Sequence, residues 1–137
     1  MGYWGVRSYE NDDAADALDA GFDRVHGAAY DDLMDDRNPL TFDQVQEKLA
    51  DGATLAAAID ALRAAVGRPF EDWDAIERLA FAGLVVRHAE FGVPIPDDLR
   101  VRALDWLEHE EFPGPEATAR RLRRDREIAL LRATAPN

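Results

Sequence analysis

Aromatic and acidic side chains crowd the first sixteen positions of the chain, and these are the residues best suited to chemistry. Indole and phenol rings beside amide and carboxylate oxygens could hold a cation or a polar ligand. The candidate ligand or partner residues are Trp4, Tyr9, Asn11, Asp12 and Asp16. The same residue types also make a helix cap with an aromatic arm docked beside it, because Asn is a preferred N-cap residue and Asp is stabilised in a first helical turn. We favour this structural interpretation, because capping alone predicts Asn and Asp at these positions and no calcium-loop pattern is present.

Elsewhere the sequence offers no catalytic constellation. Cysteine is absent, which excludes disulfides and thiolate metal sites. Ser8 is the only serine, and no nucleophile-elbow glycines surround it. The histidines form no His-x-x-x-His or Glu-x-x-His pair, and phosphate-binding loops are missing. We therefore expect no catalytic residue, no metal and no cofactor, and favour a non-enzymatic function over an enzymatic one.

The net charge of −12 limits the partners that the protein can bind. An acidic body repels the phosphates of nucleic acids and anionic lipids, so neither a nucleic acid nor a membrane is an expected partner. The longest apolar run, about residues 79–86, is too short to span a bilayer. No basic region with an apolar run opens the chain, so no secretory signal is predicted and the expected location is the cytoplasm.

A run of arginines near the C-terminus is the sharpest charge feature. Phosphate or nucleic-acid contact is one interpretation of this run, but no aromatic residues are interleaved with it. We favour a partly exposed network of ion pairs, with the arginines lying over acids of the first helices. The run consists of Arg120, Arg121, Arg123, Arg124 and Arg126.

Apolar residues recur at helical spacing along most of the chain, and no stretch shows the two-residue alternation of a strand. We predict an all-α fold, a single compact domain over residues 1–137, in which residues 1–10 form an aromatic arm packed on an irregular bundle. About six helices are expected, at residues 12–34, 42–51, 53–66 and 71–91, from residue 96 to the break at Pro113, and at residues 115–133.

Local signals refine this prediction. Asn11 and Thr41 are expected N-caps, Gly67 is an expected helix stop, and Gly21 is a possible site of a kink. The helix at residues 71–91 is the most apolar and should lie at the centre of the fold. The three tryptophans, Trp4, Trp73 and Trp106, should contribute to the core, and Leu122, Ile128 and Leu131 should face inward from the last helix.

The opening Met-Gly-x-Trp-Gly-x-x-x-Tyr-Glu-Asn-Asp-Asp-Ala-x-Asp resembles the start of an uncharacterised bacterial domain-of-unknown-function family, DUF4259. A looser likeness continues through residues 77–90 and the Gly-x-Pro-x-Pro turn at residues 92–96. The resemblance implies a bacterial protein with no settled activity, and it supplies no catalytic residue. The matching positions are Gly2, Trp4, Gly5, Tyr9, Asn11, Asp12, Ala14 and Asp16.

Two classes of function fit these observations. The first is an acidic, non-enzymatic interaction protein that meets a basic protein partner by charge complementarity, for instance an immunity protein that blocks a toxin. The alternative is a small-molecule-binding protein or an enzyme with a cleft near the N-terminal arm. A pocket lined by polar groups with perturbed pKa values would favour this alternative.

Overall fold

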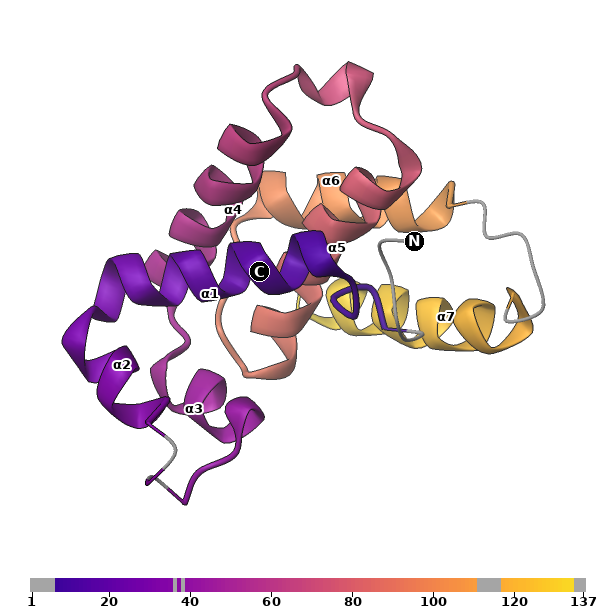
Figure 1. Cartoon of the computed structure of the whole chain (residues 1–137). Coiled ribbons are helices and arrows are strands. Elements are labelled where there is room, and N and C mark those ends of the chain that lie inside the picture. Colours follow the sequence, from indigo (N-terminus) through magenta and orange to yellow (C-terminus); the bar gives the residue numbers. More distant parts are fainter. Residues whose placement is uncertain (1–6, 36, 38, 111–116, 135–137) are drawn as a thin grey trace.

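The computed structural model describes residues 7–35, 37, 39–110 and 117–134, and every element within these ranges is a helix. The all-α prediction is therefore confirmed (Figure 1). Residues 1–6 lie outside the described residues, and the predicted contribution of Trp4 to the core falls among them. The elements are α1 (Asp12–His26), α2 (Ala28–Leu33), α3 (Phe42–Leu49), α4 (Gly52–Val66), the 3-10 helix η1 (Phe70–Asp72), α5 (Ala75–Glu90), α6 (Asp97–Glu108) and α7 (Ala117–Ala133).

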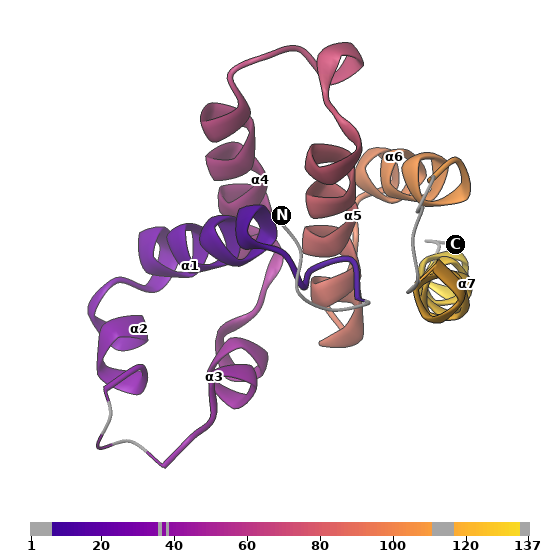
Figure 2. The ribbon, with the colours of Figure 1, turned by 45° about the vertical axis from the view of Figure 1, so that its right-hand side comes forward.

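Helix α5 lies at the centre of the bundle, as predicted. All its residues from Leu79 to Ala89 are buried, and the helix contacts α1, α4, α6 and α7. Figure 2 shows it between α1 and α4 on one side and α6 and α7 on the other. The predicted start at residue 71 is wrong, because Asp74 caps α5 by accepting a hydrogen bond from the Glu77 backbone N–H. Residues 70–72 form the separate η1 turn.

The first predicted helix is divided at Gly27, not kinked at Gly21. Gly27 has a φ of 50°, which a glycine adopts more readily than other residues, and it separates α1 from α2. Gly21 instead allows α1 and α4 to pack closely: a Cβ atom there would lie 2.7 Å from the backbone N of Ala58. The division at Gly27 and the separate η1 turn each add one element to the six helices that the sequence predicts.

Two of the three tryptophans lie in one aromatic cluster beside α5. The Trp73 side chain is buried, and Trp106 is half-buried against the core. Their ring centroids are 5.7 Å apart, and Phe70 and Phe81 pack on both at centroid distances of 4.9 to 6.2 Å. The predicted contribution of Trp73 and Trp106 to the core is confirmed.

The inward face of α7 is partly charged. Leu131 is buried and Ile128 is half-buried, but Leu122 is 64% exposed, so its predicted inward position is wrong. Arg120 occupies the inner face instead, and two residues along a helix is a rotation of about 200°. Leu122 therefore points to the opposite side.

Arg120 joins α7 to the segment after α6 through a buried ion pair and makes a second one within α7. Its guanidinium donates to both oxygens of Glu110, at 2.8 and 2.7 Å, and to Glu127, at 2.8 Å. Arg123 pairs with Glu90 and lies 3.8 Å from Glu127. The arginines thus meet acids of α5, α7 and the segment after α6. The expected pairing with acids of the first helices is wrong, because α7 packs on α5 and α6.

Candidate functional site

The arm enters α1 through a cap that uses the whole Asn11 side chain. Its Oδ1 accepts a hydrogen bond from the Ala14 N–H at 2.8 Å, and its Nδ2 donates to the Ser8 carbonyl at 2.7 Å. Asn11 is fully buried, so both ends of its amide are occupied. The predicted cap is confirmed, and this side chain has little left to offer a ligand.

Ser8 and Tyr9, in the described part of the arm, lie directly on the central helix at Gly83. A Cβ atom at this position would be 2.4 Å from the Ser8 carbonyl oxygen and 2.7 Å from the Tyr9 Cα. Only a glycine allows this approach of the two backbones. The contact fixes Tyr9 above the C-terminal half of α5.

Tyr9 and Phe91 hold the guanidinium of Arg87 between their rings. The Arg87 Cζ atom lies 4.7 Å from the Tyr9 ring centroid and 4.4 Å from that of Phe91. The Tyr9 hydroxyl donates to Glu90 Oε1 at 2.7 Å. Burial, together with this hydrogen bond, raises the pKa of Tyr9 to about 12. The phenol therefore stays protonated and acts as a donor at neutral pH.

A cavity of about 370 Å³ opens beside Tyr9, and we call it the arm cavity. Arg87 Nε donates to Gln46 Oε1 at 3.3 Å, and Arg87 Nη2 donates to Asp43 at 2.6 Å. Gln46 is 1% exposed, and its Nε2 finds no hydrogen-bond partner in the described part of the chain. The lining residues are Arg7, Tyr9, Glu10, Ala15, Leu18, Asp43, Gln46 and Arg87.

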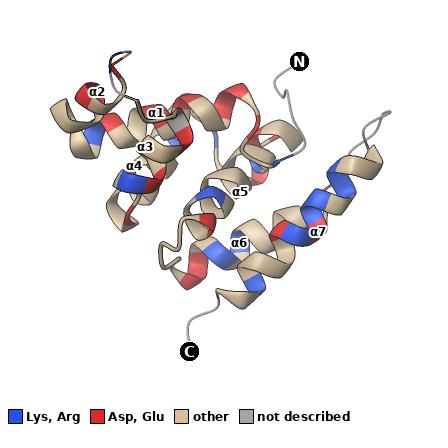
Figure 3. Ribbon diagram, turned by 90° about the horizontal axis from the view of Figure 1, so that it is seen from below, with Lys and Arg blue, Asp and Glu red and all other residues tan. Residues whose placement is uncertain are grey.

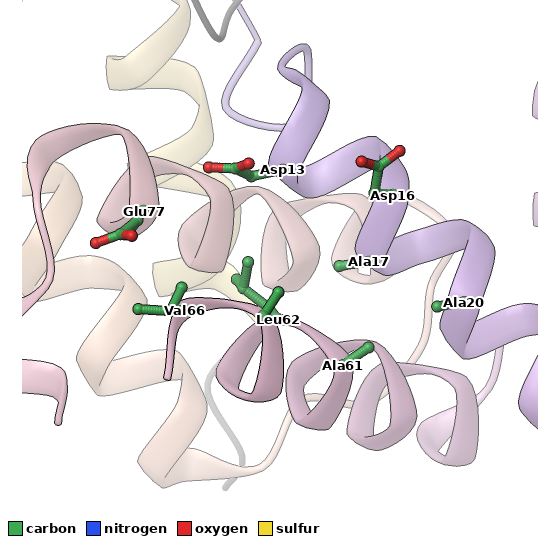
Figure 4. Close-up of a pocket in the computed structure, with 9 residues that line it drawn as sticks. Asp13, Asp16, Ala17, Ala20, Ala61, Leu62, Val66 and Glu77 are labelled. Carbon is green, nitrogen blue, oxygen red and sulfur yellow. The ribbon is translucent and has the colours of Figure 1, made fainter. Parts of the chain in front are cut away.

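A second cavity, of about 280 Å³, lies between α1 and α4, and we call it the acidic cavity. Figure 4 shows Asp13 and Asp16 on the α1 side and alanine, leucine and valine side chains on the α4 side. Burial raises the pKa of Asp13, and the charges of Glu77, Asp74, Asp16 and Asp12 raise it further. The lining residues are Asp13, Asp16, Ala17, Ala20, Ala61, Leu62, Ala65, Val66 and Glu77.

The outer surface of α1 carries a row of acids, which we call the α1 acidic face. Asp12, Asp16, Asp19 and Asp23 are exposed at spacings of four, three and four residues, which places them on one side of a helix. In the part of the chain that the structure describes, none of the four carboxylates pairs with a cation. Figure 3 shows acidic residues along α1 and basic residues gathered on α7.

The structure thus separates the residues that the sequence grouped. Tyr9 lines the arm cavity, and Asp16 lines the acidic cavity. Asp12 is exposed at the first turn of α1, and the Asn11 side chain is fully hydrogen-bonded as the cap of this helix. Whether these residues bind a ligand or a partner stays a prediction.

Sequence reasoning missed Gln46, Arg87 and Asp43. One signal was available for Arg87, since it is a charged residue inside a run that is otherwise almost entirely apolar. Gln46 gave no signal, because a glutamine beside Val45 on an amphipathic helix is usually exposed.

The histidines offer no metal site within the described residues, where no group of three His, Asp or Glu side chains could hold an ion. His88 is fully buried, and its Nδ1 donates to the Leu84 carbonyl at 2.9 Å. Its Nε2 lies 2.8 Å from the Thr54 hydroxyl. Burial lowers the pKa of His88, so the ring is neutral and serves packing.

Comparison of the chain with protein-family models, with curated proteins and with solved structures finds no match. The resemblance of the first sixteen residues to a bacterial family stays a prediction. Among the described helices, none is both long enough and apolar enough to cross a membrane.

Proposed function

We propose that the protein is a non-enzymatic interaction protein whose α1 acidic face binds a basic protein partner. The observation that carries the proposal is the row of exposed carboxylates at Asp12, Asp16, Asp19 and Asp23, none paired with a cation in the described chain. Many acids elsewhere in the described chain do have basic neighbours, including Glu77, Glu90, Glu108 and Glu110. Within the described residues the α1 acids have no cationic neighbour, and Asp19 accepts a hydrogen bond only from the neutral Tyr30 hydroxyl, so a basic partner would supply the missing charge.

Mutual repulsion on this side of the molecule is visible in the pKa values. The neighbouring carboxylate of Asp23 raises the pKa of Asp31, and like charges add to the burial that raises the pKa of Asp13. A basic partner would relieve this repulsion when it binds. Complementary charge also speeds encounter and suppresses wrong partners.

The acidic cavity fits the side chain that such a partner would present. Lysine and arginine have apolar stems and a charged head, and both are buried best when the stem meets apolar surface and the head meets acids. Ala61, Leu62 and Val66 offer that apolar surface, and Asp13 and Asp16 offer the carboxylates. An immunity protein that masks a basic toxin would work in this way. We place this role in a bacterial cytoplasm.

Affinity capture with matched variants tests the proposal. The test variant changes Asp12, Asp16 and Asp23 to Asn and keeps Asp19, which accepts a 2.7 Å hydrogen bond from the Tyr30 hydroxyl. The control makes the same change in charge on α6, with Asp98→Asn, Asp105→Asn and Glu108→Gln.

We expect wild type and control to retain a basic protein at low salt, and the α1 variant to lose it. Raising the salt from about 0.1 M to about 1 M, which shortens the Debye length from about 10 to about 3 Å, should release it from both. A partner that stays bound to the α1 variant, or that is indifferent to salt, would refute the proposal.

A further inference from the structure

The arm cavity contains a buried donor, the Gln46 Nε2 atom, for which the described residues offer no acceptor. Arg87 Nε can only donate, so the oxygen of the Gln46 amide must face it, at 3.3 Å. The amide nitrogen is thereby turned away from Arg87, and it has no acceptor within the described residues. Buried polar groups are nearly always paired, so an unpaired donor beside a cavity calls for an acceptor from outside.

We propose that the arm cavity binds a small zwitterion of the free α-amino acid class, with a short apolar side chain. The inference goes beyond the proposed function and does not depend on it. Its residues are different from those of the α1 acidic face and of the acidic cavity.

The carboxylate of such a ligand would bind at Arg87 and Gln46. The Arg87 side chain is 10% exposed and is held between two aromatic rings, so its position is fixed. Asp43, its closest carboxylate partner at 2.6 Å, has a side chain that is 77% exposed. A ligand carboxylate can replace Asp43 at Nη2 and accept a hydrogen bond from Gln46 Nε2 at the same time. Arginine suits this exchange because its planar donors match a carboxylate.

The ammonium group would bind at the acids of the same cavity. Asp43, once released from Arg87, and Glu10 are the two carboxylates of the lining. Arg7 and Arg87 balance them, so the lining carries no net charge. A ligand with both charges and a net charge of zero fits this balance, whereas a simple anion would meet the repulsion of a protein with a net charge of −12.

The size and the walls of the cavity select a short apolar side chain. Ala15 and Leu18 line it from α1, and the Tyr9 ring lines it from the arm. Its volume of about 370 Å³ is at the small end of the range for small-molecule pockets. Leucine or a similar amino acid has the matching dimensions and polarity.

Three matched compounds test the charge requirement. L-leucine carries both charges, isocaproate has the same skeleton with the carboxylate alone, and isoamylamine has the ammonium group alone. Each is titrated into the full chain, and the side-chain amide signals of Gln46 are followed in proton–nitrogen correlation spectra. We expect leucine to shift these signals saturably, and the other two compounds to bind at least about tenfold more weakly.

Two variants and one control test the residues. Gln46→Glu removes the free donor and keeps the acceptor for Arg87, so leucine binding, followed through backbone amide signals, should weaken at least about tenfold. Gln44→Glu makes the same chemical change two residues away, where Glu also suits the Thr41 capping box, and should leave binding unchanged. Asp43→Asn, at an exposed side chain, should weaken leucine binding and leave isocaproate binding unchanged or stronger.

Three different results would each overturn a different part of the proposal. No shift of the Gln46 signals with leucine up to about 20 mM overturns the proposal. Equal binding of leucine and isocaproate overturns the zwitterion in favour of a simple anion. Unchanged leucine binding in both Gln46→Glu and Asp43→Asn overturns the site. Thermal melts show whether each variant is folded. If Gln46→Glu does not fold, Asp43→Asn still tests the site.

Discussion

One carboxylate oxygen of Glu127 accepts two hydrogen bonds from Ser8, from the backbone N–H at 2.9 Å and from the hydroxyl at 2.8 Å. The two residues are 119 positions apart in the sequence. The other oxygen of Glu127 accepts from Arg120 at 2.8 Å. The last helix is therefore fastened to the arm through a buried acid, and Arg120 compensates the charge of that acid.

Removing Arg120 tests this arrangement. Arg120→Met keeps the volume of the side chain but leaves Glu127, which is 1% exposed, without its closest cation. We expect the free energy of unfolding to fall by about 3–5 kcal/mol, which is typical when one partner of a buried ion pair is lost. Urea denaturation provides the measurement. Arg126→Met on the exposed side of α7 is the control and should change stability by less than about 0.5 kcal/mol.

A small effect of Arg120→Met, comparable with that of Arg126→Met, would contradict the buried network. The variant could avoid the cost of a buried, unpaired carboxylate only if Glu127 became protonated. Repeating the denaturation at higher pH would then reveal the loss of stability, because an ionised Glu127 without its cation destabilises the folded state.

The contact between the arm and α5 is tested by Gly83→Ala. The new Cβ would lie 2.4 Å from the Ser8 carbonyl oxygen, so the arm or the helix has to shift. We expect a loss of about 1–3 kcal/mol, as for overpacking of a core. Gly52→Ala, where no atom lies within 4 Å of the added Cβ, is the matched control and should be neutral or stabilising by up to about 1 kcal/mol. Equal melting temperatures for the two variants would mean that the arm does not need this approach.

Local backbone chemistry made much of the fold predictable. Asn11 and Thr41 accept the hydrogen bonds that their residue types predict, and Gly67 ends α4 in a left-handed conformation. Each of these signals acts within four residues, so the sequence alone contains both partners. The predicted start of α5 at residue 71 is wrong because acidic residues suit both a first helical turn and an N-cap, and Asp74 is the N-cap.

The candidate site was less predictable, because its contacts join distant segments. Gln46 meets Arg87 across 41 positions, and Tyr9 meets Glu90 across 81. Which residues face each other there depends on how α3, α5 and the arm cross, and helical periodicity does not specify crossings. The burial of Arg120 is a similar case, because an arginine is rarely buried unless acidic side chains pair with it.

The buried His88 predicts a dependence of stability on pH. Burial lowers its pKa below the ordinary histidine value of about 6.5, so the unfolded chain binds more protons than the folded one as the pH falls through that value. The contribution of the neutral ring is complete above about pH 6.5 and is lost at lower pH, by at most about 1.4 kcal/mol per pH unit. Urea denaturation at a series of pH values between about 7.5 and 5.5 measures this slope.

Two variants attribute the slope to one histidine. His88→Gln should be less stable at neutral pH, because it loses the fitted ring, but its stability should change less between the two pH values. His109→Gln is the control, since the His109 side chain is 77% exposed and should not set the slope. A slope that survives in His88→Gln would have to come from other groups, and the predicted role of His88 would be wrong.

The acidic cavity can be filled without disturbing the core, which separates binding from folding. Ala65 lines the cavity from α4 and is exposed, so Ala65→Phe places a ring in the space that we propose for a cationic side chain. We expect the melting temperature to change by no more than about 2–4 °C, which corresponds to less than about 1 kcal/mol in a domain of this size. Binding of the basic partner should weaken at least about tenfold, as a change of about 1.4 kcal/mol would produce.

Ala64→Phe, at the neighbouring exposed position outside the cavity lining, is the control for added apolar surface. If both variants bind as wild type does, the partner meets the α1 acidic face without inserting a side chain; if both lose binding, the added ring and not the cavity is responsible.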